Sequence, residues 1–518
     1  MALYDHDVIV IGGGLLGCFA ARNLARYDLK IALLEKREDL CLGVSRANTA
    51  IVYSGCDTKP GTVKTSMCVK SSQAFEGLCA ELGVRYNKCG SIMICFGERG
   101  EEALRKKLEQ GAQNGVRGIK MLTRAEVLEL EPNISENAYA GLYVPDTGTV
   151  MPWELCLAAA ENAASNGVEI IRGAKVKNIS RDSDGYSLKV ENASGDALYR
   201  ARGVVNCAGL NADILLEKVF DPVVRIVPDA GDYYVLDTKV KGFIGHVIFH
   251  EPEDKSKGLT LVPTVDGNIL AGPTERELEK EEGRGERAGA ADTESTASAA
   301  ARDTEWGGDE PGFETSREGL ELLRSLVAEV VPDLPMEHVI RSFGAVRPNP
   351  YEVEDGASEH NRGSMKLSNR SVNDFSIIEA ADEAFISFVG VKTPGLTCAN
   401  ELGIYAAERL AGNLGAARNK NFDPRRAAQI RIRDMSFEDR ESVVRANPDY
   451  GRIVCRCKGV TEGEVLDAIR STPGAVSLDG VKHRAGTGLG RCQGGFCTQH
   501  IVEILSRELG GAPEDYLT

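Results

Sequence analysis

The sequence predicts a protein of the α/β and α+β classes, with a parallel-sheet domain first, a mixed sheet beside it and a small module at the C-terminus. Two observations carry this prediction. Residues 7–35 read as strand, glycine-rich turn, helix and strand, which is how a parallel sheet begins. Residues 450–518 contain four grouped cysteines and their own helix patterns. The 518 residues are enough for about three cores.

Composition excludes several classes of function. Hydrophobic residues at 42% and charged residues at 27% are typical of globular proteins. The net charge of −16 provides no field for nucleic acid, so we expect no such partner. No run approaches the roughly 18 apolar residues of a membrane span, and the start lacks the basic region of a signal peptide. We therefore expect a cytoplasmic protein, membrane-associated only through a partner, with reduced cysteines.

The glycine-rich turn has the pattern of a dinucleotide-binding motif. Gly12, Gly14 and Gly17 follow an apolar strand and open a helix. Gly12 permits a tight turn, Gly14 allows the backbone to approach a pyrophosphate, and Gly17 allows helix and strand to pack closely. Glu35 ends the next strand, where a carboxylate accepts hydrogen bonds from a ribose. The motif predicts a Rossmann-like domain binding FAD or NAD, and its place near the start favours FAD.

Two pairs of cysteines define the C-terminal module. Cys455 and Cys457 are separated by one residue, and Cys492 and Cys497 by four. Thiolates are preferred ligands of zinc and of iron–sulfur clusters. The one-residue spacing disfavours zinc, which usually takes two to four residues between ligands. The glycines of residues 486–495 suit a loop that closes around a cluster. A cluster, a zinc ion and a vestigial site all remain open from the residues alone.

Several segments together resemble the D-amino-acid-oxidase-like flavoproteins. Residues 43–55 are similar to the loop that lies against the flavin, and residues 390–397 to the C-terminal flavin loop. Residues 204–209 and the Lys175-Val176 pair are similar to two further FAD-binding strands. The C-terminal module resembles the bacterioferritin-associated-ferredoxin-like domain, which carries a 2Fe–2S cluster. The order of these parts resembles the large subunit of anaerobic FAD-dependent glycerol-3-phosphate dehydrogenases and, over the first ~410 residues, the L-2-hydroxyglutarate dehydrogenases.

This resemblance implies the binding residues. Besides the glycine motif and Glu35, the residues implied for FAD are Ser45, Asn48, Thr49, Val176, Ala208, Gly209, Gly395, Leu396 and Thr397. Those implied for the 2Fe–2S cluster are Cys455, Cys457, Cys492 and Cys497. Many relatives carry His where this chain has Tyr53, so we expect FAD to be bound without a covalent link.

The resemblance also implies the domain organisation. The FAD-binding parts are expected at residues 1–80, 150–215 and 340–412, and a substrate layer at 81–149 and 216–339. Residues 279–319 contain no Leu, Ile, Val or Met, so we expect a flexible acidic insertion at about 279–316. A helical connector is expected at 413–449, followed by the 2Fe–2S module at 450–518.

The expected chemistry is hydride transfer from a small anionic substrate to FAD, which requires a proton acceptor and a cationic clamp. Arg347 is the best candidate for the clamp because a guanidinium holds phosphate or carboxylate by two bonds. Lys392 and Tyr53 are candidates beside the flavin. His250 is a candidate base, as is His246, although a lone His is more often structural.

The sequence thus predicts a FAD-dependent dehydrogenase that passes electrons singly through a 2Fe–2S cluster. Glycerol 3-phosphate is the first expected substrate and a 2-hydroxy acid the second. The expected partner is an electron-accepting iron–sulfur or quinone-reducing subunit. An amino-acid or amine dehydrogenase and a non-catalytic flavin/iron–sulfur electron carrier are the alternatives.

Overall fold

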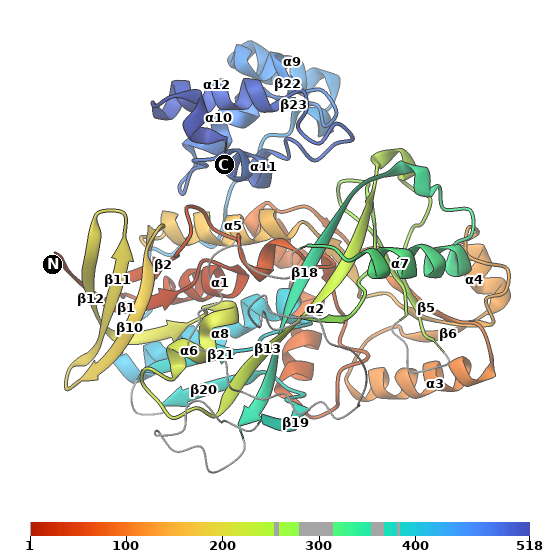
Figure 1. Ribbon diagram of the computed structural model, residues 1–518, viewed down its shortest axis with the longest axis horizontal. Helices are drawn as coiled ribbons and strands as arrows, with labels where there is room; N and C mark the ends of the chain where they lie inside the picture. The colour runs from red at the N-terminus through yellow and green to blue at the C-terminus, as the bar shows by residue number, and fades with distance from the viewer. Residues whose placement is uncertain (1, 253–257, 279–313, 354–366, 381–383, 518) are drawn as a thin grey trace, which may run out of the picture.

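The computed structural model describes residues 2–252, 258–278, 314–353, 367–380 and 384–517. Two large sheets with their helices form the main body, and a small helical module sits against one side of it (Figure 1). The predicted acidic insertion lies almost wholly outside the described residues. Within those residues no helix is both long and apolar enough to cross a bilayer.

The first sheet has eight strands and confirms the Rossmann-like prediction. Its parallel strands are β1 (Ala2–Ile11), β2 (Ile31–Leu34), β9 (Glu169–Ile171), β12 (Gly195–Asn206) and β21 (Phe385–Val389). Antiparallel strands extend it: β10 (Lys175–Asp182), β11 (Gly185–Asn192) and β20 (Ser376–Ala380). Both faces are covered, because Val8 and Val10 of β1 pack into one core and Ile9 and Ile11 into another. Burial on both faces explains the continuous apolar run.

Four helices cover one face of this sheet and share its core. They are α1 (Leu15–Leu24), α2 (Val63–Leu82), α5 (Pro152–Ser165) and α8 (Gly395–Leu414). The short α6 (Ala212–Leu216) packs on the opposite face. A three-stranded sheet consists of β3 (Ile51–Val52), β4 (Tyr86–Asn87) and β8 (Gly148–Val150).

The second sheet has ten strands and is mixed, as predicted for the substrate layer. Its strands are β5 (Ser91–Cys95), β6 (Lys120–Thr123), β7 (Ala140–Val144), β13 (Val224–Leu236), β14 (Val247–His250), β15 (Thr260–Pro263), β16 (Ile269–Ala271), β17 (Arg276–Glu277), β18 (Val339–Val353) and β19 (Leu367–Ser371). Of its pairings only β5 with β14 is parallel among the described strands. Helices α3 (Glu98–Gln113), α4 (Arg124–Leu130) and α7 (Arg317–Val330) pack against it.

The segment 340–353, expected in an FAD-binding part, lies in β18 of the ten-stranded sheet, where it pairs with β13 along almost its whole length. Strand β13 is continuous because this long partner keeps all of it in register. Arg347 therefore projects from the ten-stranded sheet.

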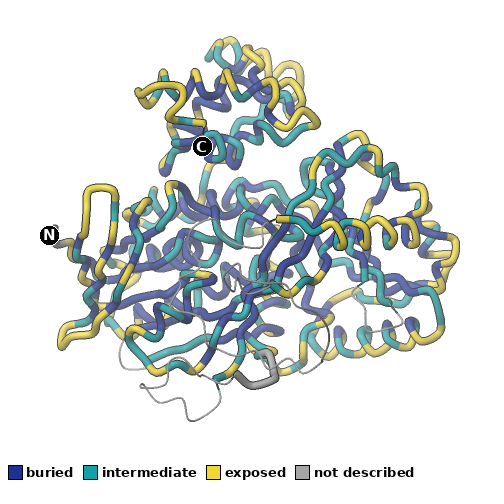
Figure 2. Tube along the Cα trace, viewed as in Figure 1, coloured by how far each residue is buried: buried dark blue, intermediate teal, exposed yellow. Residues whose placement is uncertain are grey.

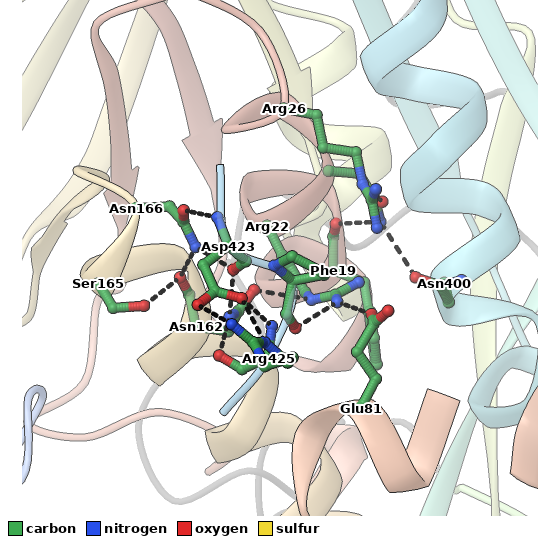
Figure 3. Close-up of polar contacts among 12 residues, drawn as sticks. Phe19, Arg22, Arg26, Glu81, Asn162, Ser165, Asn166, Asn400, Asp423 and Arg425 are labelled. Atoms are coloured by element: carbon green, nitrogen blue, oxygen red, sulfur yellow. Dashed lines mark hydrogen bonds and ion pairs between the residues drawn. The ribbon is translucent and has the colours of Figure 1, made fainter. Parts of the chain in front are cut away.

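The connector expected at 413–449 is helical only in part: α8 ends at Leu414 and the next α-helix is α9 (Phe437–Ala446). Figure 3 shows the polar contacts that side chains of α1 and α5 make with the chain between them. The buried Arg22 donates to the carbonyl of Pro424 (3.1 Å) and to Asn162 (3.0 Å), and Asn162 donates to the carbonyls of Asp423 and Arg425. These carbonyls are satisfied by side chains of α1 and α5 and not by a helix.

The C-terminal module has its own apolar core (Figure 2). It contains β22 (Ile453–Cys455), β23 (Val460–Thr461), α10 (Glu462–Arg470), α11 (Leu478–Ala485) and α12 (Thr498–Leu509). A capping box begins α10: Thr461 accepts from the Glu464 N–H, and Glu464 accepts from the Thr461 N–H. Helix α11 faces α5 of the main body (Figure 1).

Candidate active site and cysteine site

A cavity of about 490 Å³ lies between the two large sheets and begins at the glycine motif. Eleven of the residues predicted to bind FAD line it: Gly12, Gly14, Glu35, Ser45, Asn48, Thr49, Val176, Ala208, Gly209, Gly395 and Leu396. Gly17 and Thr397 support the cavity from behind and are not among its lining residues. The residues that the family resemblance implies for FAD therefore lie together along one continuous cavity, although they come from segments far apart in the chain.

The geometry of the glycine motif fits a dinucleotide. Gly12 has a φ of +101°, and a Cβ there would lie 2.4 Å from the carbonyl oxygen of Cys207. A Cβ on Gly17 would lie 1.8 Å from the carbonyl oxygen of Gly12. Only glycine permits this close packing of strand, turn and helix. The N-terminal end of α1 thus meets the cavity, where its N–H groups favour an anion.

Glu35 is held beside this turn. Its carboxylate accepts hydrogen bonds from the N–H groups of Gly13 (2.6 Å) and Arg37 (2.9 Å). Burial raises the pKa of Glu35, while these two hydrogen bonds oppose the increase. The carboxylate lines the cavity and is positioned for the ribose contact expected from the sequence.

Thr397 joins the two flavin-facing loops. Its hydroxyl oxygen accepts a hydrogen bond from the Tyr53 N–H at 2.9 Å. The Tyr53 side chain lines the cavity, and burial raises its pKa to about 12. Tyr53 is therefore a neutral phenol at neutral pH, able to donate a hydrogen bond.

Arg347 and Lys392 lie at the far end of the cavity. Arg347 donates from Nε to Asp229 at 2.5 Å, directly across the β13–β18 pair. Lys392 donates to the Asn349 side chain at 3.0 Å. Burial lowers the pKa of Lys392, and the nearby charges of Lys64 and Arg347 lower it further.

The two histidines do not line this cavity. In β14 it is Phe249 that lines it, and the next residue, His250, packs against Phe96 with ring centroids 5.1 Å apart. His246 is paired with Glu131 at 2.6 Å. Alternation of side chains along a strand explains the difference, since neighbours face opposite sides of the sheet. His250, the expected base, therefore lies outside the lining of this cavity.

Asp229 and Asn349 were missed by the sequence analysis. Asn349 is two residues after Arg347 on one strand, so the period of the strand was a usable signal. Asp229 had no local signal, because it is 118 residues from its partner.

The four module cysteines form two pairs. Cys457 and Cys492 are exposed, with sulfurs 3.3 Å apart. Cys455 and Cys497 are buried, and the Cys497 thiol hydrogen-bonds to Cys455 and lowers its pKa to about 6. In the described chain no three His, Cys, Asp or Glu side chains gather around one metal-ion position. Two pairs match the two irons of a 2Fe–2S cluster, whereas a single zinc ion needs four ligands at one point.

The backbone around the cysteines supplies hydrogen-bond donors. N–H groups of Cys457, Lys458 and Gly488 point at the Cys455 sulfur. A Cβ on Gly490 would lie 2.3 Å from the Cys457 Cβ, so the predicted glycine loop does pack on the cysteines. N–H donors stabilise thiolates and cluster sulfurs, and these residues therefore fit an iron–sulfur group.

The module docks on the main body through buried charges and an aromatic contact. Arg484 donates to both carboxylate oxygens of Asp39, at 2.5 and 2.9 Å. The His483 ring lies 4.4 Å from that of Trp153, centroid to centroid. Trp153 in turn donates to the carbonyl of Arg46, in the loop that lines the cavity, at 2.8 Å. The cysteine module is thus connected to the flavin-facing loop by direct contacts.

A second interface contact involves Asp266. It pairs with Arg85 (2.8 Å) and Arg433 (2.6 Å), and lies 4.0 Å from Lys458, which follows Cys457. Burial alone would raise the pKa of Asp266, but these cations lower it well below its usual range.

Comparisons with known proteins agree with this arrangement. Residues 7–409 match the family model "FAD dependent oxidoreductase", and residues 453–507 match "BFD-like [2Fe-2S] binding domain". The chain is 35% identical over 506 residues to a glycerol 3-phosphate dehydrogenase of Caloramator mitchellensis, covering 97% of this chain and 94% of that protein. It is 30% identical over 273 residues to an L-2-hydroxyglutarate dehydrogenase of Escherichia coli O17:K52:H18, covering 52% and 63%.

A solved structure agrees on the fold. The dithionite-reduced, FAD-bound L-α-glycerophosphate oxidase of Mycoplasma pneumoniae superposes with a TM-score of 0.67 at 24% identity, covering 82% of this chain and 98% of that one. The glycine turn, the lined cavity and the paired thiols fit FAD and a 2Fe–2S cluster. The chain belongs to the FAD dependent oxidoreductase family and carries a BFD-like [2Fe-2S] binding domain at its C-terminal end.

Proposed function

We propose that this protein is a glycerol-3-phosphate dehydrogenase that passes electrons from FAD through its 2Fe–2S cluster to a partner. The observation that carries the proposal is that two cationic side chains, Arg347 and Lys392, both line the cavity that fits FAD. The similarity to a glycerol 3-phosphate dehydrogenase along nearly the whole chain supports the choice of substrate.

Arg347 binds the phosphate. Its Nε is fixed by Asp229, and Nη2 lies 3.3 Å from the Thr274 carbonyl, so the guanidinium is held before substrate arrives. A guanidinium fixed in this way loses little side-chain entropy on binding. Tyr53 lines the same cavity, and its phenol donates a hydrogen bond to the substrate.

Lys392 accepts the hydroxyl proton. Its lowered pKa makes the neutral amine more accessible, and Asn349 orients the nitrogen by accepting a hydrogen bond from it. Bound FAD would supply the acceptor for the hydride of the carbinol C–H bond, and the product would be dihydroxyacetone phosphate. Proton uptake leaves an ammonium on Lys392, whose positive charge would favour negative charge gained in this cavity.

Anaerobic mixing with candidate substrates tests this proposal. We expect sn-glycerol 3-phosphate to bleach the flavin absorbance, and L-2-hydroxyglutarate and glycine to leave it unchanged. Bleaching by L-2-hydroxyglutarate instead would support the second candidate, which the 30% identity over half the chain favours. Bleaching by none of the three would reject a dehydrogenase of these substrates and leave the electron-carrier alternative. Acid precipitation should release all of the flavin, as a non-covalent cofactor requires.

Arg347→Ala tests the clamp. Removal of a guanidinium that binds a charged group costs about 2–5 kcal/mol, so kcat/KM should fall about 30-fold or more while FAD stays bound. Arg317→Ala is the matched control, because that arginine is exposed and pairs with Glu321 on the same helix, α7. Equal turnover of the Arg347 variant and the control would remove Arg347 from the substrate site.

A further inference from the structure

The exposed edge of the cysteine site differs from the rest of its module. We define this cluster edge as Arg456, Cys457, Arg491, Cys492 and Phe496, all of which are exposed. The sulfurs of Cys457 and Cys492 lie 3.3 Å apart, and an arginine immediately precedes each cysteine. Neighbouring Cα atoms are about 3.8 Å apart, so the backbone of each arginine lies directly beside that of an exposed cysteine.

The two arginines lack the partners that other arginines of the module have. Arg452 and Arg507 both pair with Glu462, and Arg470 pairs with Glu508. In the described part of the chain, neither Arg456 nor Arg491 has a carboxylate within ion-pair distance. No carboxylate among the described residues therefore compensates their charges at this surface, and both guanidinium groups remain accessible beside the cysteines.

An aromatic ring completes the surface. The Arg456 guanidinium lies 4.4 Å from the Phe496 ring centroid, and Phe496 is 42% exposed. A cation over an aromatic face holds its position and keeps its charge available to solvent. Arginine and aromatic residues are also the side chains that contribute most to protein interfaces. The cluster edge thus combines a local positive charge, an exposed ring and the exposed side of the redox site.

We propose that the cluster edge is the docking surface for a one-electron acceptor protein whose own redox centre is surrounded by acidic residues. This proposal rests on the proposed function only in that electrons leave through the cluster. In each encounter one electron passes from the reduced cluster to the oxidised centre of the acceptor, with no proton or bond exchanged. Two encounters carry away the two electrons of one hydride.

Charge complementarity selects an acidic partner even though the whole chain carries −16. At about 0.1 M salt the Debye length is ~10 Å, so distant carboxylates are screened while Arg456 and Arg491 act directly on a partner at the cluster edge. Electrostatic steering of this kind raises association rates by roughly 10–1,000-fold at low salt.

The test is electron transfer from the dithionite-reduced holoprotein to two probe proteins, followed by stopped flow. The probes are plastocyanin, with an acidic face, and cytochrome c, with a basic one. The variant R456E/R491E should transfer to plastocyanin at least about tenfold more slowly at low salt, and to cytochrome c faster. Added salt should slow the wild type with plastocyanin and should not slow the variant.

R470E is the control: it makes one Arg→Glu change elsewhere in the module, with half the charge change of the double variant, at an arginine that pairs with Glu508. It should behave as the wild type. The cluster spectrum of each variant must be intact; if the double glutamate variant loses its cluster, R456Q/R491Q provides the same comparison with a smaller expected decrease. Equal plastocyanin rates for the wild type, R470E and a cluster-containing cluster-edge variant would overturn the proposal. Because dithionite replaces the substrate, this result is independent of whether glycerol 3-phosphate bleaches the flavin.

Discussion

The glycine motif and the cysteine module both hold a redox group, but they assemble its site from different lengths of chain. The FAD cavity is lined by residues from Ile11 to Leu396 and rests on both large sheets. The four cysteines lie between residues 455 and 497, above a core made only of module residues. A site built locally on its own core should form or fail separately from one that needs the whole main body.

The largest expected effect comes from filling the glycine turn. Gly17→Val places a side chain where even a Cβ lies 1.8 Å from the Gly12 carbonyl oxygen, so strand and helix must separate. We expect FAD binding to be lost, measured as flavin per chain, while the cluster absorbance remains. Gly412→Ala on α8 meets no atom within 4 Å and should keep both groups. Loss of the cluster together with FAD would contradict the separation of the two sites.

The converse substitution, Cys497→Ser, should remove the cluster and leave FAD bound. It removes one of the two buried sulfurs and the hydrogen bond that the thiol makes with Cys455. Iron and acid-labile sulfide should fall to a small fraction of the wild-type content, and flavin per chain should not change. Cys89→Ser, a half-buried cysteine of the main body, is the control and should retain the cluster. Wild-type iron and sulfide in Cys497→Ser would remove this residue from the ligand set.

The same contrast explains what could be predicted from the sequence. The turn Gly12–Gly17 and the module cysteines are short motifs whose meaning depends on neighbours in the chain, and both were located correctly. The pairs Arg347–Asp229 and Arg484–Asp39 join residues 118 and 445 positions apart, and no local pattern specifies such partners. The connector expected at 413–449 contains α9, but its backbone carbonyls at Asp423 and Pro424 bind Asn162 and Arg22 from distant helices, which no local pattern specifies.

The next effect concerns the contact that joins the two regions. Burial alone would raise the pKa of Asp39, but the hydrogen bonds and charge of Arg484 outweigh it and lower the pKa. Asp39→Asn leaves the Arg484 charge buried without its counter-ion, and breaking a buried pair in this way costs about 3–5 kcal/mol. We expect the module to detach or unfold at a lower temperature than the wild type, seen by calorimetry and by faster proteolysis of the connector.

Two substitutions make this experiment specific. Asp423→Asn changes an exposed pair with Arg425 and should shift the melting temperature little. The double variant Asp39→Leu/Arg484→Met should recover part of the stability, since two apolar groups leave no buried charge. If Asp39→Asn melts and is cleaved like Asp423→Asn, the ion pair does not fasten the module.

The smallest expected effect is a pH dependence of this docking. Burial lowers the pKa of His483 to about 3, against the ring of Trp153 and near Asp39, Asp479, Lys482 and Arg484. The ordinary pKa of a histidine is about 6.5, so protonation of His483 favours the undocked state. The stability that neutral His483 contributes to docking is therefore complete above pH 6.5 and falls as the pH decreases toward 3. By pH 5 the loss should be of the order of 1–2 kcal/mol.

His483→Phe keeps a ring against Trp153 and should lose less stability than the wild type between pH 7 and 5. His500→Phe, on an exposed His of the same module, should retain the wild-type dependence. Parallel stability curves for the wild type and His483→Phe would show that this histidine does not sense pH at the interface.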